Sequence, residues 1–155
     1  MSIYYFAYGS NMLSERMDAR IPEAKIAGIA RLYGWDLVWD KISTDGSGKA
    51  NLREENGKVV WGVVYIIPES RMPDLDKVEG GYQRIKVEVE CDKNGKLAAC
   101  TYVSEKRDAN LLPYDWYKDL VLKGAKEHSL PSDYIEKIAR IESQSDNRKA
   151  AGETT

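Results

Sequence analysis

The sequence predicts an α+β fold around a closed or nearly closed sheet, in a single domain over residues 1–142. Three observations support this prediction. Runs rich in β-branched and aromatic residues fill the first two thirds of the chain, and the longest helical pattern comes last. A length of 155 residues suits one core, and 43% apolar residues can fill it. From residue 143 to 155 the only apolar residues are alanines, so this tail is expected to be disordered.

The first predicted element is a buried strand over residues 3–8, which ends at a Gly-Ser-Asn turn. A short helix follows and ends before Pro22. Two strands are expected between residues 24 and 41, on either side of Gly34. Residues 44–48 are rich in glycine and serine and predict a flexible loop.

The strongest hairpin signal is the pair Asn56-Gly57, which separates residues 50–53 from the run 59–67. That run is apolar on both faces, as is typical of a central strand. A short helix over residues 70–78 follows, and two glycines are expected to end it.

Residues 82–91 alternate apolar and polar side chains, and an Asn-Gly pair turns the chain into a second run over residues 97–103. This pattern predicts a half-exposed antiparallel hairpin. If the turn has two residues, Cys91 faces Ala98 rather than Cys100, so free thiols are expected rather than a disulfide.

Two helices close the predicted order of elements. In the longer one, apolar positions recur at helical spacing and predict a face that packs on the core. These positions are Tyr117, Leu120, Val121, Gly124, Ala125 and His128. The last helix carries Ile135, Ile138 and Ala139.

Composition excludes several classes of function. Lys and Arg total 23 and Asp and Glu total 25, which leaves a net charge of -2 and no general attraction to nucleic acid or anionic membrane. One histidine and two cysteines cannot by themselves build a zinc site or a multi-histidine metal centre. No run reaches the roughly 20 apolar residues of a membrane span, and no signal peptide is visible. We therefore expect a cytoplasmic protein without a metal site built from histidine and cysteine.

The first candidate site is the turn from Tyr8 to Asn11, at the point where a strand is followed by a helix. Gly9 allows close backbone approach, and successive N–H groups at a helix start can receive a carboxylate or carbonyl oxygen. The pattern lacks the second glycine and the lysine of a phosphate-binding loop. The alternative interpretation is an ordinary connection between strand and helix.

The second candidate is Glu79, in the last turn of the predicted 70–78 helix and just before two glycines. The helix dipole and the nearby acids Asp74 and Asp76 are expected to disfavour its ionisation. A partly protonated carboxyl is what a general acid or base needs. Tyr82 and Tyr117 could present hydroxyls to a pocket, or could be amphipathic core residues.

Several sequence blocks occur in order along the chain. They are YFAYGSN at 5–11 with Glu15-Arg16, ARL at 30–32, VWGVVY at 60–65, LDKVEG at 75–80, and KGAKE at 123–127 with LP at 130–131. This set resembles the γ-glutamylcyclotransferase family. The resemblance covers residues 3 to about 142.

The resemblance implies a small mixed β-barrel with flanking short helices, and release of 5-oxoproline from a γ-glutamyl amino acid without cofactor or metal. It implies that Glu79 is the catalytic acid and base, and that the enzyme can be a homodimer. The residues implied or proposed to bind substrate are Tyr5, Phe6, Ala7, Tyr8, Gly9, Ser10, Asn11, Tyr82 and Tyr117.

Two alternatives stay open at this point. The same ring closure could act on a γ-glutamyl amine or on a γ-glutamyl protecting group, with Glu79 unchanged. The chain could also be a non-catalytic binding domain on the same fold.

Overall fold

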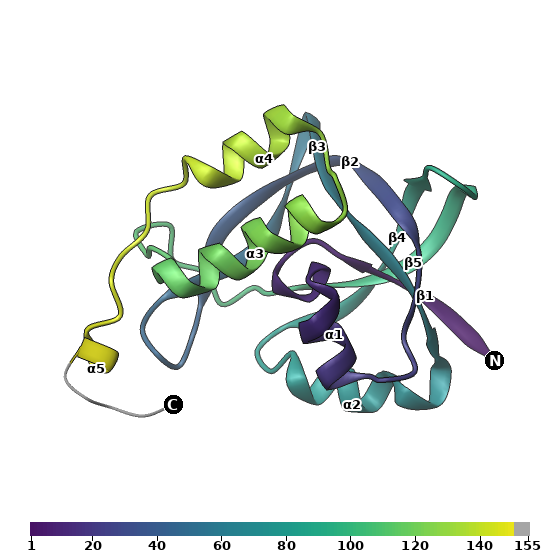
Figure 1. The fold of residues 1–155 in the computed structure, drawn as a ribbon, viewed down its shortest axis with the longest axis horizontal. Helices are drawn as coiled ribbons and strands as arrows, with labels where there is room; N and C mark the ends of the chain where they lie inside the picture. The colour runs from purple at the N-terminus through teal and green to yellow at the C-terminus, as the bar shows by residue number, and fades with distance from the viewer. Residues whose placement is uncertain (151–155) are drawn as a thin grey trace.

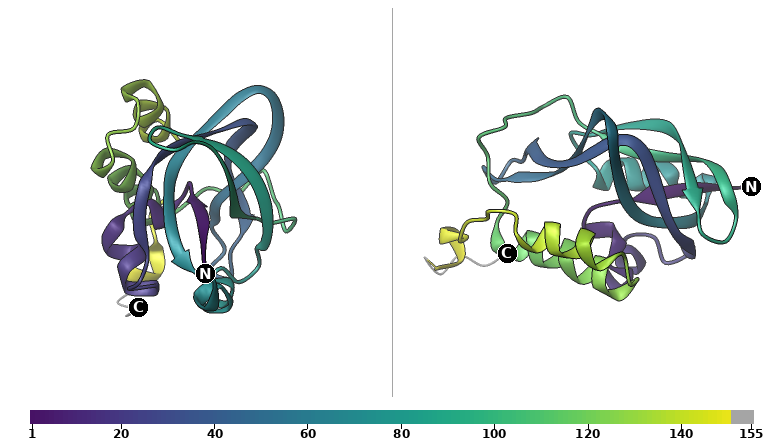
Figure 2. Two further views of the ribbon diagram at one scale, coloured as in Figure 1. Left: turned by 90° about the vertical axis from the view of Figure 1, so that its right-hand side faces the viewer. Right: turned by 90° about the horizontal axis from the view of Figure 1, so that it is seen from above.

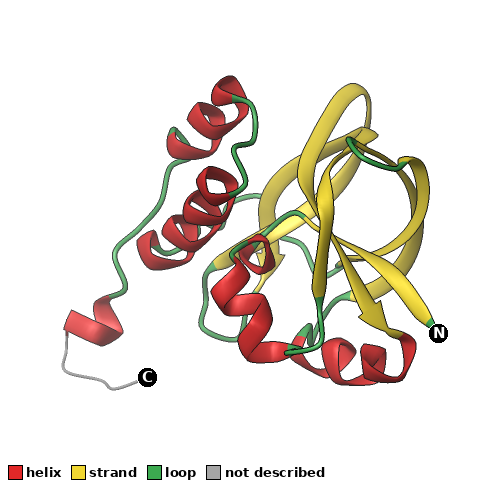
Figure 3. Cartoon of the chain, turned by 45° about the vertical axis from the view of Figure 1, so that its right-hand side comes forward, coloured by secondary structure: helices red, strands yellow, loops and turns green. Residues whose placement is uncertain are grey.

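The computed structural model describes residues 1–150, with the side chains of residues 1–148, and shows five strands that close into a barrel with helices on its outside (Figures 1 and 3). The strands are β1 (Ser2–Ala7), β2 (Lys25–Ile42), β3 (Gly48–Pro68), β4 (Gln83–Cys91) and β5 (Gly95–Val103). The helices are η1 (Ser10–Met12), α1 (Ser14–Arg20), η2 (Glu69–Arg71), α2 (Met72–Val78), α3 (Asp115–Glu127), α4 (Ser132–Ala139) and α5 (Asn147–Ala150). The predicted α+β fold with a small mixed barrel is confirmed.

The barrel has the strand order β1-β3-β2-β4-β5, and its strands curve round a common interior (Figure 2, left). All neighbours are antiparallel except β1 and β5, which run parallel where Tyr5 lies opposite Cys100. This parallel contact closes the sheet. It also places the end of β1, and the turn that follows it, next to the loop that begins after β5.

Two predictions about the longest strands, β2 and β3, are wrong. Residues 50–53 and 59–67 do not form a hairpin with each other, because both runs pair with β2. Gly57 has a φ of +84°, and it lies in an irregularity of one continuous strand rather than in a connecting turn. Gly34 lies at the matching irregularity of β2, so the two strands predicted around it are one. The connecting turn is the predicted loop over residues 44–48, where the Ser43 N–H donates to a carbonyl at 3.0 Å.

The second predicted hairpin, β4 and β5, is present with a longer turn. Cys91 lies opposite Gly95, so three residues connect the strands and the predicted pairing of Cys91 with Ala98 is wrong. Cys100 lies opposite Lys86, and both cysteines are free and buried.

The predicted helices are present and pack on the barrel through one cluster of buried side chains. In α4, Tyr134 and Ile138 are the buried residues, and Ala139 is exposed. His128 ends α3, where its Nε2 lies 2.7 Å from the carbonyl oxygen of Met12. No helix in the described part of the chain is long and apolar enough to cross a membrane.

The predicted disordered tail over residues 143–155 differs from the structure in its first part. Backbone bonds at 2.8 and 2.9 Å tie Gln144 to Asp115 and Pro113, and the Trp116 indole N–H donates to Asp146 at 2.9 Å. Polar contacts hold this segment in place. The prediction of disorder considered only its lack of apolar residues and therefore missed its ordered part. Residues 151–155 lie outside the described residues.

Gly124 sets how closely α3 approaches the turn after β1. A Cβ at this position would lie 2.7 Å from the backbone nitrogen of Leu13 and 2.8 Å from the Cβ of Met12. Helix and turn therefore pack nearly backbone to backbone. Only a glycine fits here without displacing η1.

We expect Gly124→Ala to lower the free energy of unfolding by about 1–2 kcal/mol, because overpacking of about 1–3 kcal/mol outweighs a helix-propensity gain of up to about 1 kcal/mol. Urea unfolding measures this change. Lys123→Ala is the control: it is exposed on the same helix and is expected to change stability by less than about 0.5 kcal/mol. A Gly124→Ala protein as stable as the wild type would contradict the tight contact.

Candidate active site

A pocket with about 310 Å³ of empty space lies where β1 ends, beside the end of α2 and the first half of α3. Its lining consists of the turn after β1, of aromatic and small side chains from the surrounding strands, helix α3 and the connection before β4, and of Glu79. The lining residues are Tyr5, Tyr8, Gly9, Ser10, Asn11, Ala50, Glu79, Tyr82, Tyr102 and Tyr117. The structure therefore brings together both candidate sites, the turn and the glutamate, with the two tyrosines.

Phe6 and Ala7 are the predicted site residues that do not line this pocket. The Phe6 ring is fully buried in the core, and its carbonyl already accepts a hydrogen bond from Thr101 Oγ1 at 2.7 Å. Ala7 pairs with Val63 in the sheet. Both residues support the pocket wall from behind.

Glu79 directly follows α2, and 15% of its side chain is exposed. Its Oε1 accepts a hydrogen bond from Asn11 Nδ2 at 2.6 Å. Arg20 Nη1 lies 3.6 Å from the same oxygen. One amide and one guanidinium therefore hold a largely buried carboxyl against the pocket.

Burial raises the pKa of Glu79 above its ordinary value. Arg20, the Asn11 hydrogen bond and more distant cations lower this pKa, but they do not cancel the effect of burial. The pKa shift has the predicted direction, but burial is its largest cause, and the predicted contribution of Asp74 and Asp76 is not among the main causes. Asp74 instead pairs with Arg71, and Asp76 accepts a hydrogen bond from Tyr102.

Asn11 is the centre of the hydrogen-bond network. Its Nδ2 also donates to the Tyr5 hydroxyl at 3.0 Å, and its Oδ1 accepts from Arg20 Nη1 at 2.8 Å. Both amide hydrogens are thus used, and the orientation of the side chain is fixed. Asn11 is 3% exposed, so this network is shielded from water.

The backbone of the turn offers free donors. Within the described residues, the N–H groups of Gly9, Ser10 and Asn11 donate to no carbonyl or side chain, as expected at the start of a helical turn. The Ser10 hydroxyl accepts from Arg16 Nε at 3.0 Å, and its own proton has no acceptor among the described residues. The turn therefore offers a ligand three backbone N–H donors and one hydroxyl donor.

Three tyrosines are fixed by the strands around them. The hydroxyls of Tyr8 and Tyr82 donate to the carbonyls of Tyr102 and Ala50, both at 2.6 Å. Tyr117 accepts from the Ala50 N–H at 3.2 Å, and its own proton has no acceptor among the described residues. Tyr117 can therefore donate to a ligand in the pocket.

Sequence reasoning missed several residues around the site. Arg16 and Arg20 are spaced i, i+4 in α1, a spacing that places both on the face beside the turn and could have been noticed. Lys41, Ala50 and Tyr102 reach the site through strand pairing between distant segments. No local pattern marks them.

Among the described residues, no group of three or more His, Cys, Asp or Glu side chains is placed to hold a metal ion. The pocket lining includes one carboxyl and neither histidine nor cysteine. The arrangement can accept and return one proton at Glu79 and can donate hydrogen bonds from the turn and from Tyr117.

Comparison with known proteins agrees with this architecture. A model of the AIG2-like family matches residues 59–138. The chain is 35% identical to γ-glutamylcyclotransferase of Bos taurus in an alignment of 149 positions that covers 91% of this chain and 79% of that protein. It is 34% identical to the Mus musculus protein of that name, over 89% of this chain and 78% of the other. A solved structure of a γ-glutamyl cyclotransferase superposes with a TM-score of 0.87 at 32% identity, over 94% and 91% of the two chains. By this similarity, over a fold and a pocket that agree with it, the chain belongs to the γ-glutamylcyclotransferase family.

Proposed function

We propose that the chain is a γ-glutamylcyclotransferase, which converts a γ-glutamyl amino acid to 5-oxoproline and the free amino acid. The observation that carries the proposal is the Glu79 carboxyl, whose pKa burial raises, at the wall of a pocket with free backbone donors. The relatives named above carry the same activity in their names. The similarity to these enzymes and a site that can transfer a proton therefore support the same function.

The reaction is a ring closure within the substrate. The α-amino nitrogen bonds to the γ-carbonyl carbon, and the bond from that carbon to the leaving nitrogen breaks. Glu79 as carboxylate takes a proton from the α-ammonium group so that the amine can attack, and as carboxylic acid gives that proton to the leaving nitrogen. The ring nitrogen then loses its second proton, which the released amine takes up, so the products are the lactam and an ammonium ion. Water is not consumed. Because both reacting groups belong to one molecule, the pocket accelerates the step mainly by holding a folded conformer.

The turn over residues 9–11 and Tyr117 would bind the glutamyl part of the substrate. Their free N–H and O–H groups suit an anionic oxygen, which is either the oxyanion formed during attack or the α-carboxylate. The fixed Asn11 network keeps Glu79 in one orientation beside them. Tyr5, Tyr8 and Tyr82 would form the walls around the ring as it closes.

We also propose that the enzyme works in the cytoplasm, which the two free, buried cysteines support. One cluster of buried side chains that joins the barrel to α3 and α4 supports a single domain over residues 1–142. The homodimer implied by the family resemblance stays a prediction.

We expect Glu79→Gln to fold and to lose 5-oxoproline formation by about 10²- to 10⁴-fold, the usual range for a general acid and base. The measurement is release of 5-oxoproline from γ-glutamyl-alanine, with circular dichroism to show that the fold is kept. Glu88→Gln, on the exposed face of β4, is the matched control and should remain fully active. A fully active Glu79→Gln would contradict the role of this carboxyl, and a wild type inactive on every γ-glutamyl compound would contradict the proposed function.

The pH profile tests the same carboxyl. Because burial raises the pKa of Glu79, the acidic limb of kcat/KM should have its midpoint above the ordinary value of about 4.3. Arg20 lowers this pKa, so Arg20→Gln should move the midpoint to higher pH. A midpoint that moves to lower pH, or not at all, would show that Arg20 does not act on the titrating group.

Stability should depend on pH with a defined sign. The folded chain holds the Glu79 proton more tightly than the unfolded chain, so between about pH 4.3 and the raised pKa it binds more protons and becomes less stable as the pH rises. The Glu79→Gln variant has no carboxyl at this position, so its stability does not fall with rising pH for this reason. The free energy of unfolding of the wild type minus that of the variant should therefore decrease from pH 4 to pH 8 in urea titrations. An increase over that range would mean that the folded pKa is lowered.

A further inference from the structure

A wider vestibule adjoins the pocket and shares Ser10, Glu79, Tyr82 and Tyr117 with it. Its empty space is about 830 Å³. Five cationic side chains line it, against Glu79 as the acid among its lining residues. The cations are Arg16, Arg20, Lys41, Lys49 and Lys77. This surface is strongly positive in a chain whose net charge is -2.

Lys41 is the most informative of these cations. It is 8% exposed, and its Nζ donates to the carbonyl of Gly80 at 3.2 Å and lies 5.0 Å from the centre of the Tyr82 ring. Within the described residues it forms no ion pair. Burial lowers the pKa of Lys41, and the charges of Glu79 and Asp45, which lie beyond ion-pair distance, only partly offset this effect. An anionic ligand in direct contact would stabilise this buried charge.

Arg16, in α1, is also a partly buried cation without a carboxylate partner. Its Nε donates to the neutral Ser10 hydroxyl, and in the described part of the chain no carboxylate pairs with it. Lys49, in contrast, lies 3.4 Å from Asp45. Two cations of the vestibule thus lack a carboxylate partner although each is at least partly buried.

The cations also lie close enough to affect one another. Burial lowers the pKa of Lys49, and the charges of Arg16 and Lys41 lower it further. Burial lowers the pKa of Arg16 as well, and the charge of Arg20 adds to this effect. Repulsion among these groups is relieved when an anion binds between them.

We propose that this vestibule is the subsite for the leaving group and that it binds carboxylates, so that the preferred substrates are γ-glutamyl conjugates of acidic amino acids. The inference rests on the proposed function, because Glu79 must return its proton to the leaving nitrogen. The glutamyl part occupies the inner pocket, and what lies beyond the amide bond extends past Glu79 into the vestibule. An acidic amino acid brings two carboxylates, which match Arg16 and Lys41, the two cations of the vestibule that are at least partly buried and form no ion pair within the described residues. A cationic leaving amine is repelled.

The test compares leaving groups of different charge. The leaving groups of γ-glutamyl-glutamate and γ-glutamyl-glutamine have the same shape and differ by one negative charge. The leaving group of γ-glutamyl-ε-lysine, of different shape, carries an ammonium group beside its carboxylate. We expect kcat/KM to be about tenfold higher for the glutamate than for the glutamine conjugate, the usual effect of one charge-assisted hydrogen bond, and lowest for the lysine conjugate. Higher ionic strength should reduce the ratio between the first two substrates.

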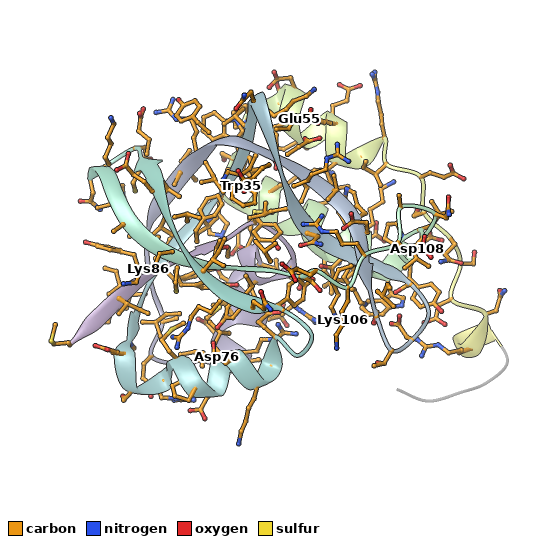
Figure 4. The ribbon with its side chains drawn as sticks, turned by 180° about the vertical axis from the view of Figure 1, so that it is seen from behind. Trp35, Glu55, Asp76, Lys86, Lys106 and Asp108 are labelled. Carbon is orange, nitrogen blue, oxygen red and sulfur yellow. The ribbon has the colours of Figure 1, made fainter. Side chains whose placement is uncertain are left out.

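Lys41→Met and Arg16→Gln test the residues. Each should bring the glutamate-to-glutamine ratio of kcat/KM toward one, mainly through the KM for the glutamate conjugate. Lys86→Met is the control, because this exposed lysine, labelled in Figure 4, lies on β4 and is not among the residues that line the vestibule. Lys41→Met keeps a side chain that can fill a buried position, so it remains informative if Arg16→Gln does not fold.

The outcomes separate the two proposals. Release of 5-oxoproline from all three conjugates with equal efficiency, or a ratio unchanged in both variants, would overturn the carboxylate subsite and leave the proposed function standing. Absence of 5-oxoproline from every conjugate, and from γ-glutamyl-alanine, would overturn the proposed function and the subsite with it.

Discussion

The hydrogen bond between Asn11 and Glu79 is the interaction on which the rest of the site depends. It joins the turn after β1 to the end of α2, two segments that are 68 residues apart in the chain. Without it, a largely buried carboxyl would lack the donor that makes its ionised form tolerable. With it, burial and hydrogen bonding act in opposite directions on one pKa, and burial dominates. The result is a carboxyl whose pKa lies above its ordinary value and that can both accept and return a proton, which ring closure requires.

Local patterns in the sequence identified the site residues that lie next to turns. Gly9 ends a strand, and Glu79 precedes two glycines, so both could be identified without the fold. Lys41 and Tyr102 could not, because they reach the site only when the barrel places the ends of β2 and β5 next to the turn after β1, and no local pattern marks that arrangement. The error at Asn56-Gly57 has a related cause. A positive φ at glycine serves a bulge inside a strand as well as a hairpin turn, and only the partner strand decides between them.

The composition of ten tyrosines against one phenylalanine follows from the same architecture. A small barrel needs aromatic rings to fill its core, and a pocket at its end needs polar groups in fixed positions. Tyrosine supplies both from one side chain. The hydroxyls of Tyr8 and Tyr82 bond to backbone carbonyls and fix the walls, whereas Tyr117 keeps a proton to donate. The core and the pocket wall are thus built from the same residues.

The positive vestibule and the acid at its inner end are electrostatically coupled. Arg16 and Lys41 lower the pKa of Glu79 in the free protein. A carboxylate that binds between these cations offsets their charge, so the pKa of Glu79 rises when the substrate is in place. A higher pKa makes the carboxylate a stronger base toward the α-ammonium group at the moment when it must take that proton. When the acidic product leaves, the cations again favour the ionised form of Glu79, and the site returns to the state in which the next substrate finds it. In this way the charge of a leaving group that does not itself react can assist the proton transfer.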